Sequence, residues 1–146
     1  MREGAKVALV DLSTSKGAEV VKELDSDNCI FVPADITKEN DIKDALEEIK
    51  HKFKRLDTAV SCAGIGVAFK TYNFNKDTAH HLEDFTRVQM VNTIGTFNVI
   101  RLSAGLIGKN DPDIDNQRGV IINTASIAAY DGQMGQAAYS ASKVNT

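Results

Sequence analysis

The sequence has no tryptophan, two prolines and two cysteines. It also lacks any apolar run near the roughly 18 residues that a membrane span needs. Cys29 and Cys62 do not have CxxC spacing, so we expect no structural metal and a reducing compartment. The opening residues, MREGAK, have neither the apolar core of a signal peptide nor the composition of an Arg/Ser-rich transit segment. These absences alone predict a cytoplasmic protein that does not enter the membrane.

Neither sign of charge dominates. The formal net charge is −3 and the isoelectric point is near 5.6, which gives no electrostatic footprint for nucleic acid. Hydrophobic residues make up 42% and charged residues 25%, close to the average of soluble globular proteins, so a disordered chain is excluded. We therefore expect a single folded domain over residues 1–146.

Four short apolar runs predict strands, and most of them are continuously apolar rather than alternating. They are Lys6–Asp11, Cys29–Pro33, Asp57–Cys62 and Gly119–Ala125. Continuous apolar runs are typical of parallel strands that are covered on both faces. Because helical patterns separate these runs, the order indicates βαβ units and a doubly wound α/β sheet.

Three segments have helical patterns. One follows Thr37, its expected N-cap, a second covers Leu82–Leu106, and a weaker one covers Ser13–Leu24. Gly64–His81 contains no clear element, and a long loop of that kind is usually functional or disordered. The polar segment Lys109–Arg118 is expected to be an exposed turn.

The stretch YSASK places Tyr139 and Lys143 four residues apart, so on a helix they share a face. A free tyrosine has a pKa of about 10 and is a poor base at neutral pH. A nearby cation favours the phenolate, which makes tyrosine a usable general acid/base. The alternative is an incidental surface pair, and the spacing alone favours that alternative.

Ser126 raises the weight of the catalytic interpretation. It follows the last expected strand, where parallel α/β sheets place their ligand crevice, and its hydroxyl can hydrogen-bond a substrate oxygen. A lone serine there is usually a cap or turn residue, but its combination with Tyr139 and Lys143 is much more specific. Asn92 lies near the apolar stripe of the long helix, where asparagine is unfavourable, so an inward role is reasonable.

Asp11 ends the first expected strand. An acidic side chain there can bind the adenosine ribose hydroxyls and repel a 2′-phosphate, and no arginine follows, so NAD is favoured over NADP. A helix-capping role for Asp11 is the competing interpretation. Cys62, Ala63 and Gly64 end the third strand with small residues, as expected where backbone meets a cofactor. Three histidines lack metal-ligand spacing and are expected to be solvated: His51, His80 and His81.

In this order along the chain, the residues resemble the short-chain dehydrogenase/reductase family. The matching motifs are the strand end at Asp11, Asp35 after the second strand, SCAGI at Ser61–Ile65, Asn92, Ser126, and Tyr139-x-x-x-Lys143. Four further stretches are similar to a mitochondrial member of the family that acts on 3-hydroxyacyl-CoA esters and hydroxysteroids. They are PADIT, FKTYN with HLEDF, GTFNVIRL, and RGVIINTASIAAYDGQMGQAAYSASK.

The resemblance implies a role for each matching residue. Tyr139 would be the catalytic acid/base, and Ser126 would hold the substrate oxygen. Lys143 would bind the nicotinamide ribose and tune Tyr139, while Asn92 would support a water-linked proton path. Asp11, Asp35, Ile36 and Cys62 would line the adenosine side of an NAD site. Ala63 and Gly64 would also bind the cofactor.

The resemblance also implies an NAD-dependent oxidoreductase that interconverts a secondary alcohol and a ketone, with 3-hydroxyacyl-CoA or hydroxysteroid substrates. It implies a homotetramer when complete and a mitochondrial location. The implied fold is a partial Rossmann-like parallel sheet, because the family's first strand, its TGxxxGxG turn and its C-terminal strands have no counterpart in this sequence. We therefore expect residues 1–146 to form an incomplete NAD-binding domain.

Two other functions stay open on the residues alone. One is a catalytically inactive, truncated product that acts only through partner or subunit binding. The other is a different nucleotide-binding fold, such as a methyltransferase, which could also use an acidic residue at a strand end. The set of Ser126, Tyr139 and Lys143 argues against the second, because methyl transfer has no need of a phenolate base.

Overall fold

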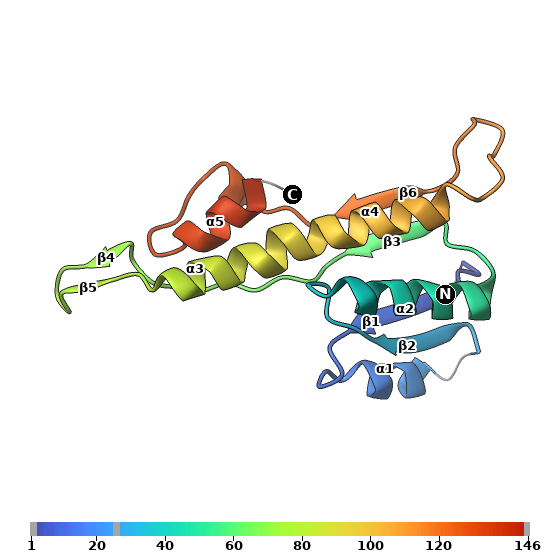
Figure 1. Ribbon diagram of the computed structural model, residues 1–146, viewed down its shortest axis with the longest axis horizontal. Coiled ribbons are helices and arrows are strands. Elements are labelled where there is room, and N and C mark those ends of the chain that lie inside the picture. Colours follow the sequence, from blue (N-terminus) through green and yellow to red (C-terminus); the bar gives the residue numbers. More distant parts are fainter. Residues whose placement is uncertain (1–2, 25–26, 145–146) are drawn as a thin grey trace.

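The computed structural model describes residues 3–24 and 27–144, so the first two residues of the segment searched for a targeting signal lie outside the described residues. Helices and strands alternate along much of the chain (Figure 1). The strands are β1 (Val7–Asp11), β2 (Cys29–Pro33), β3 (Thr58–Ser61), β4 (Tyr72–Asn73), β5 (Thr78–Ala79) and β6 (Val120–Asn123). The helices are α1 (Gly17–Leu24), α2 (Glu39–Phe53), α3 (Leu82–Gln89), the π-helix η1 (Met90–Gly95), α4 (Thr96–Ile107), the 3₁₀-helix η2 (Ile127–Ala129) and α5 (Ala137–Val144).

The four expected strands form two parallel pairs, which confirms a partial Rossmann-like α/β fold. β1 pairs with β2 from Val7 and Cys29 onward, and β3 pairs with β6 from Thr58 and Val120 onward. Within residues 3–24 and 27–144, no strand pairing joins the two sheets. The arrowheads of β2, β3 and β6 point to one side of the molecule, so the carboxyl ends of both sheets face that side (Figure 1).

The main core lies between β2 and α2. Val32 and Ala34, at the end of β2 and just after it, pack against Ile42 and Ala45 of α2, and all four are buried. Fully burying a valine or isoleucine side chain stabilises the fold by about 1.5–3 kcal/mol. Residues of α4, including Val99, pack against the same cluster, so this helix contacts both halves of the molecule. None of the helices so described has the length and apolar character of a membrane span.

The start of α2 differs from the prediction. The residue before the helix is Lys38, and it makes no side-chain capping bond. The Thr37 hydroxyl, which was expected to cap the helix, instead donates to Asp35 Oδ1 at 2.7 Å. The predicted Thr37 cap is therefore wrong, because the helix begins at Glu39 and Lys38 occupies the N-cap position.

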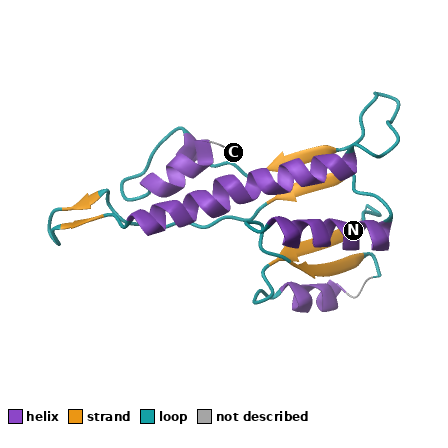
Figure 2. Ribbon diagram, viewed as in Figure 1, coloured by secondary structure: helices purple, strands orange, loops and turns teal. Residues whose placement is uncertain are grey.

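The helix expected over Leu82–Leu106 is present with one internal change. α3, η1 and α4 run as a continuous rod (Figure 2), but residues Met90–Gly95 form a π-helical turn. A π-helical turn holds one more residue than an α-helical turn and frequently occurs at functional sites. Apolar spacing predicted the rod correctly but gave no indication of the π-helical turn.

The segment Gly64–His81, in which no element was expected, contains a short antiparallel hairpin made of β4 and β5. It projects beyond the end of α3, away from both parallel sheets (Figure 1). The Tyr72 hydroxyl donates to Asp77 Oδ1 at 2.5 Å, and this bond raises the pKa of Tyr72. The polar segment Lys109–Arg118 is exposed as predicted except at Asn110, whose Nδ2 donates to Leu56 O at 2.7 Å.

Candidate active site

Helix α5 carries Tyr139 and Lys143 on one face. The Lys143 ammonium lies 5.7 Å from the centroid of the Tyr139 ring. Tyr139 is half-buried, and Lys143 is only 7% exposed. The alternative of an incidental surface pair is therefore wrong, because a surface lysine would not give up its hydration in this way.

The buried Lys143 ammonium has an unusual hydrogen-bonding position. Its Nζ donates to Thr124 O at 2.6 Å, just beyond the carboxyl end of β6. A lysine ammonium has three N–H donors. Among the described residues Thr124 O is the acceptor found for Nζ, so two N–H groups remain for a ligand or solvent at this end of the sheet.

Asn92 joins the loop after β3 to helix α5. It lies in η1 and is 1% exposed, which confirms the predicted inward position. Its Oδ1 accepts from Ile65 N at 2.8 Å, and its Nδ2 donates to Ile65 O at 2.8 Å and to Ser142 Oγ at 2.9 Å. Ser142 Oγ in turn donates to Tyr139 O at 2.7 Å. The amide of Asn92 thus fixes the loop and α5 relative to each other.

The loop after β3 approaches the same residues closely. A Cβ built on Gly64 would lie 3.4 Å from Asn92 Oδ1 and 4.0 Å from Lys143 Nζ. A Cβ on Gly66 would lie 3.6 Å from Tyr139 Cδ2. Cys62 and Ala63 are exposed just before Gly64, and Thr124 Oγ1 donates weakly to Cys62 Sγ at 3.7 Å. Gly64, one of the small residues expected near a cofactor, therefore lies beside the buried ammonium.

Ser126 lies two residues after Thr124, with an extended backbone, and caps η2. Its Oγ accepts from Ala128 N at 3.2 Å. Ser126 is therefore a cap residue, as one of the two interpretations expected. The hydroxyl still has its own proton and a second lone pair, so capping and a contact with a substrate oxygen are compatible.

Three of the residues expected on the adenosine side, Asp11, Asp35 and Ile36, belong to the β1–β2 half, whereas Cys62 follows β3. Asp11 is exposed at the end of β1, and its Oδ1 accepts from Leu12 N at 2.7 Å. Asp35 Oδ1 accepts from the Thr37 hydroxyl and, at 3.0 Å, from Thr37 N. These bonds, the hydroxyl first, hold the pKa of Asp35 below its ordinary value. Ile36 is half-buried, and its side chain lies against Gly95 of η1.

The structure therefore brings Asn92, Tyr139, Lys143 and the Gly64 loop together at the ends of β3 and β6. Sequence reasoning missed the partners Ile65 and Thr124, because they act through backbone atoms that any residue type supplies. Ser142 carried a signal, since a small polar residue three positions after Tyr139 lies on the same helical face.

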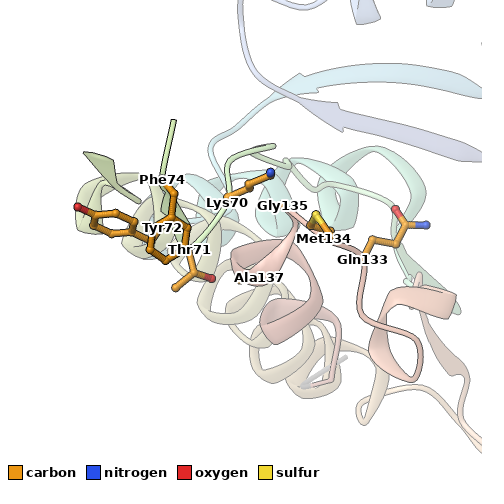
Figure 3. A pocket seen from close by; sticks show the side chains of 8 residues that line it. All are labelled: Lys70, Thr71, Tyr72, Phe74, Gln133, Met134, Gly135 and Ala137. Atoms are coloured by element: carbon orange, nitrogen blue, oxygen red, sulfur yellow. The ribbon is translucent and has the colours of Figure 1, made fainter. Parts of the chain in front are cut away.

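Two other features lie outside this cluster. The expectation that all three histidines are solvated is wrong for His80, which is half-buried with its ring edge-on to Phe69 at 5.8 Å. An open pocket of about 500 Å³ lies between the hairpin arm and the segment before α5 (Figure 3). Its lining includes Lys70, Tyr72 and Phe74 on one side and Gln133, Met134 and Ala137 on the other. None of the predicted site residues is among its lining residues.

Comparison with known proteins gives consistent results. A family model described as short chain dehydrogenase matches residues 1–146. The chain is 63% identical over 142 residues to 3-hydroxyacyl-CoA dehydrogenase type-2 of Drosophila melanogaster, covering 97% of this chain and 55% of that protein. The human protein of the same name is 60% identical over 141 residues, covering 97% of this chain and 54% of the relative.

Solved structures agree with the sequence relatives. The crystal structure of 3-hydroxyacyl-CoA dehydrogenase type-2 from Mycobacterium avium superposes with a TM-score of 0.90 at 34% identity. The superposition covers 99% of this chain and 56% of that one. The chain thus spans about half the length of the curated relatives it matches.

Proposed function

The chain belongs to the short-chain dehydrogenase family, and on that basis we propose that a protein containing it is an NAD-dependent oxidoreductase. Its reaction interconverts a secondary alcohol and a ketone. Residues 1–146 supply an incomplete NAD-binding domain together with the acid/base residues. The observation that carries this proposal is the buried Lys143 ammonium beside Tyr139, with N–H groups still available at the carboxyl ends of β3 and β6.

The chain's own residues account for the proton transfer. The Tyr139 hydroxyl gives a proton to the substrate oxygen during reduction and takes one from it during oxidation. The neighbouring Lys143 cation stabilises negative charge on the phenol. Ser126 holds the substrate oxygen, and Asn92 keeps α5 in place through Ser142 and Ile65 while supporting a water-linked proton path.

The residues present fit a nicotinamide cofactor, which when bound accepts or donates the hydride. Lys143 has donors for the hydroxyls of the nicotinamide ribose, and Tyr139 lies beside it. Asp11 offers an exposed carboxylate for the adenosine ribose, and its negative charge disfavours NADP. The remaining adenosine-side residues are Asp35, Ile36 and Cys62, and Ala63 and Gly64 complete the proposed cofactor site.

The substrate proposed is a 3-hydroxyacyl-CoA ester, because that is what the names of the relatives state. A hydroxysteroid is the second candidate substrate, from the resemblance described above. The same resemblance favours a mitochondrial homotetramer. In support of an assembly, Met90, Ile94 and Phe97 are exposed apolar side chains spaced along one face of the η1–α4 rod.

The test uses a chimera in which residues 1–146 replace the matching part of the Drosophila melanogaster relative. We expect this chimera to form NADH from NAD and a 3-hydroxyacyl-CoA ester. A folded chimera that binds NAD but forms no NADH with acyl-CoA or steroid substrates would contradict the proposed activity. Light scattering of the same protein would test the tetramer. Fractionation of cells that express the whole natural protein containing residues 1–146 would test the mitochondrial location.

A further inference from the structure

Asn98 is a buried polar side chain on α4 that takes no part in the catalytic cluster. It is 6% exposed. Its Nδ2 donates to Ile36 O at 2.9 Å, and its Oδ1 accepts from Arg101 Nη2 at 2.8 Å. Both ends of the amide are thus engaged, which fixes its orientation. The bond to Ile36 connects positions that are 62 residues apart in the sequence.

The Ile36 side chain is held by the same rod. A Cβ built on Gly95 would lie 2.7 Å from both Cδ1 and Cγ1 of Ile36. Only a residue without a side chain allows η1 to come this close. Ile36 is therefore fixed by Asn98 at its carbonyl and by Gly95 at its side chain.

These contacts matter because the two parallel sheets are not hydrogen-bonded to each other in the described part of the chain. Asp35 and Ile36 follow β2 and belong to the β1–β2 half. Asn92, in the same rod as Asn98, belongs to the catalytic cluster in the other half. The Asn98–Ile36 bond therefore links the end of β2 to the rod that carries Asn92.

An ion pair between α4 and α2 lies beside the Asn98–Ile36 hydrogen bond and is the weaker of the two interactions. Arg101 Nη2 bonds Glu39 Oε2 at 2.7 Å, and the two side chains are 38% and 49% exposed. Exposed ion pairs contribute little because water and salt screen them. The buried amide bond is thus the tie that sets the position of Ile36.

We propose that Asn98 is a positioning residue for the adenosine side of the nucleotide site and acts through the carbonyl of Ile36. This inference rests on the proposed function, because it assumes that Asp35 and Ile36 contact the adenosine group. Asn98 itself touches neither cofactor nor substrate. Its bond keeps Asp35 and Ile36 at the fixed distance from Tyr139 and Lys143 that one dinucleotide must span.

The test is Asn98→Asp in the chimera. Aspartate keeps the size of the side chain and the acceptor for Arg101, but a carboxylate cannot donate to Ile36 O and repels it. We expect the Kd for ADP-ribose and the KM for NAD to rise roughly tenfold, from the loss of one buried hydrogen bond. The kcat at saturating NAD and the KM for the hydroxyacyl-CoA ester stay unchanged. A merely structural role would lower kcat together with the folded fraction.

Two further variants make the result decisive. Asn75→Asp places the same charge change on the exposed hairpin turn and should leave all these constants unchanged. Asn98→Ala removes the donor without adding charge and gives the same split between KM and kcat, so it serves if the aspartate variant does not fold. An unchanged Kd for ADP-ribose in a folded Asn98 variant overturns the positioning role alone. Failure of the unsubstituted chimera to bind ADP-ribose overturns this inference together with the proposed function.

Discussion

At the scale of single residues, the position of Lys143 is the most informative feature. Moving an ammonium out of water is costly unless the group is paired, and here the described residues offer it the Thr124 carbonyl. We infer that the charge of this buried residue acts on a neighbouring side chain and on a ligand. The neighbour is Tyr139, and the ligand side is the shared carboxyl edge of β3 and β6.

Tyr139→Phe in the chimera removes the hydroxyl that transfers the proton but keeps the packing of the ring. We expect kcat to fall by roughly 10²–10⁴-fold, the usual contribution of a general acid/base, with the melting temperature little changed. Tyr72→Phe, on the hairpin, is the matched control and should retain normal turnover. Steady-state NADH formation measures both, and near-normal turnover of Tyr139→Phe would show that another group is the base.

Asp11→Asn tests the choice of cofactor. The asparagine Oδ1 can still accept from Leu12 N, so the turn after β1 stays and only the charge is lost. We expect the preference for NAD over NADP, as a ratio of kcat/KM values, to fall roughly fivefold or more. The reason is that two unit charges about 4 Å apart repel by about 1 kcal/mol in bulk water. Equal kcat/KM values for the two cofactors before mutation would contradict the assignment of Asp11.

Thr37→Val tests the electrostatics of Asp35. Folding lowers the pKa of Asp35, so the ionised carboxylate stabilises the fold above the ordinary aspartate pKa of about 3.9. This stability is lost as the pH falls below that value and through the folded pKa. Removing the Thr37 hydroxyl should move the pKa of Asp35 up toward its ordinary value, and stability should depend less on pH in this acidic window. NMR titration of the carboxyl group measures the change, and Thr78→Val, whose hydroxyl donates to a carbonyl, should leave it unaltered.

At the scale of elements, the place of Asn92 in the middle of the rod brings it within reach of two partners at once. The π-helical turn lies in the middle of the rod, where Asn92 can contact both the loop after β3 and α5. Asparagine in an ordinary exposed helix would only reduce helix stability. Here its amide satisfies both the N–H and the C=O of Ile65.

Asn92→Ala should therefore destabilise the chimera. Each buried polar group left without a partner costs about 1–3 kcal/mol, and the affected groups are the N–H and the C=O of Ile65. We expect a lower free energy of unfolding in urea and a lower kcat, because α5 loses its link to the loop. Asn40→Ala, on the exposed surface of α2, should not lower stability, since alanine is the better helix former. Equal stability of the two variants would mean that water replaces the lost bonds.

The sequence predicted the elements because their signals are local. Continuous apolar runs identified the four strands, and regular apolar spacing identified the rod. Boundaries were less accurate where a residue serves another contact. Gly119, predicted to begin a strand, lies outside β6 and has a φ of 152°. A Cβ there would lie 2.3 Å from Asp57 O, so this close approach requires glycine. The Thr37 hydroxyl likewise bonds Asp35 rather than the helix.

The site was predicted as a set of residue types, but its internal connections were not. The motif proposed Tyr139, Lys143, Ser126 and Asn92 as candidates, and the structure brings Asn92, Tyr139 and Lys143 close together. The ties through Ile65 O, Thr124 O and Ile36 O use backbone carbonyls, which carry no sequence signal. They follow only from the three-dimensional packing of the rod and α5 against the two halves.

At the scale of the whole molecule, the separation of the two sheets leaves strand edges unpaired and apolar side chains exposed in the described residues. Val60, Val120 and Ile122 are each about half exposed on the face of the β3–β6 sheet that α4 does not cover. The β1 and β3 edges that face away from their partners have backbone groups with no strand to bond in the described residues. The halves are joined instead through α2, α4 and the Asn98–Ile36 tie.

Residues 1–146 expressed on their own should consequently be aggregation-prone or only partly folded, and should bind NAD weakly or not at all. An unpaired buried amide or carbonyl costs about 1–3 kcal/mol, and a strand edge has several of them. Because a whole domain is stable by only about 5–15 kcal/mol, a handful of such losses removes most of it. The sequence also has no TGxxxGxG turn to hold the pyrophosphate.

Thermal unfolding and NAD titration of the purified 146-residue chain measure its stability and its affinity for NAD, with the chimera as the comparison. We expect the chimera to unfold in one sharp transition, because the relative supplies the part of its length that this chain does not cover. The isolated chain should instead show a broad or absent transition. A sharp cooperative transition of the isolated chain with micromolar NAD affinity would mean that the β1–β2 and β3–β6 sheets close on each other in solution.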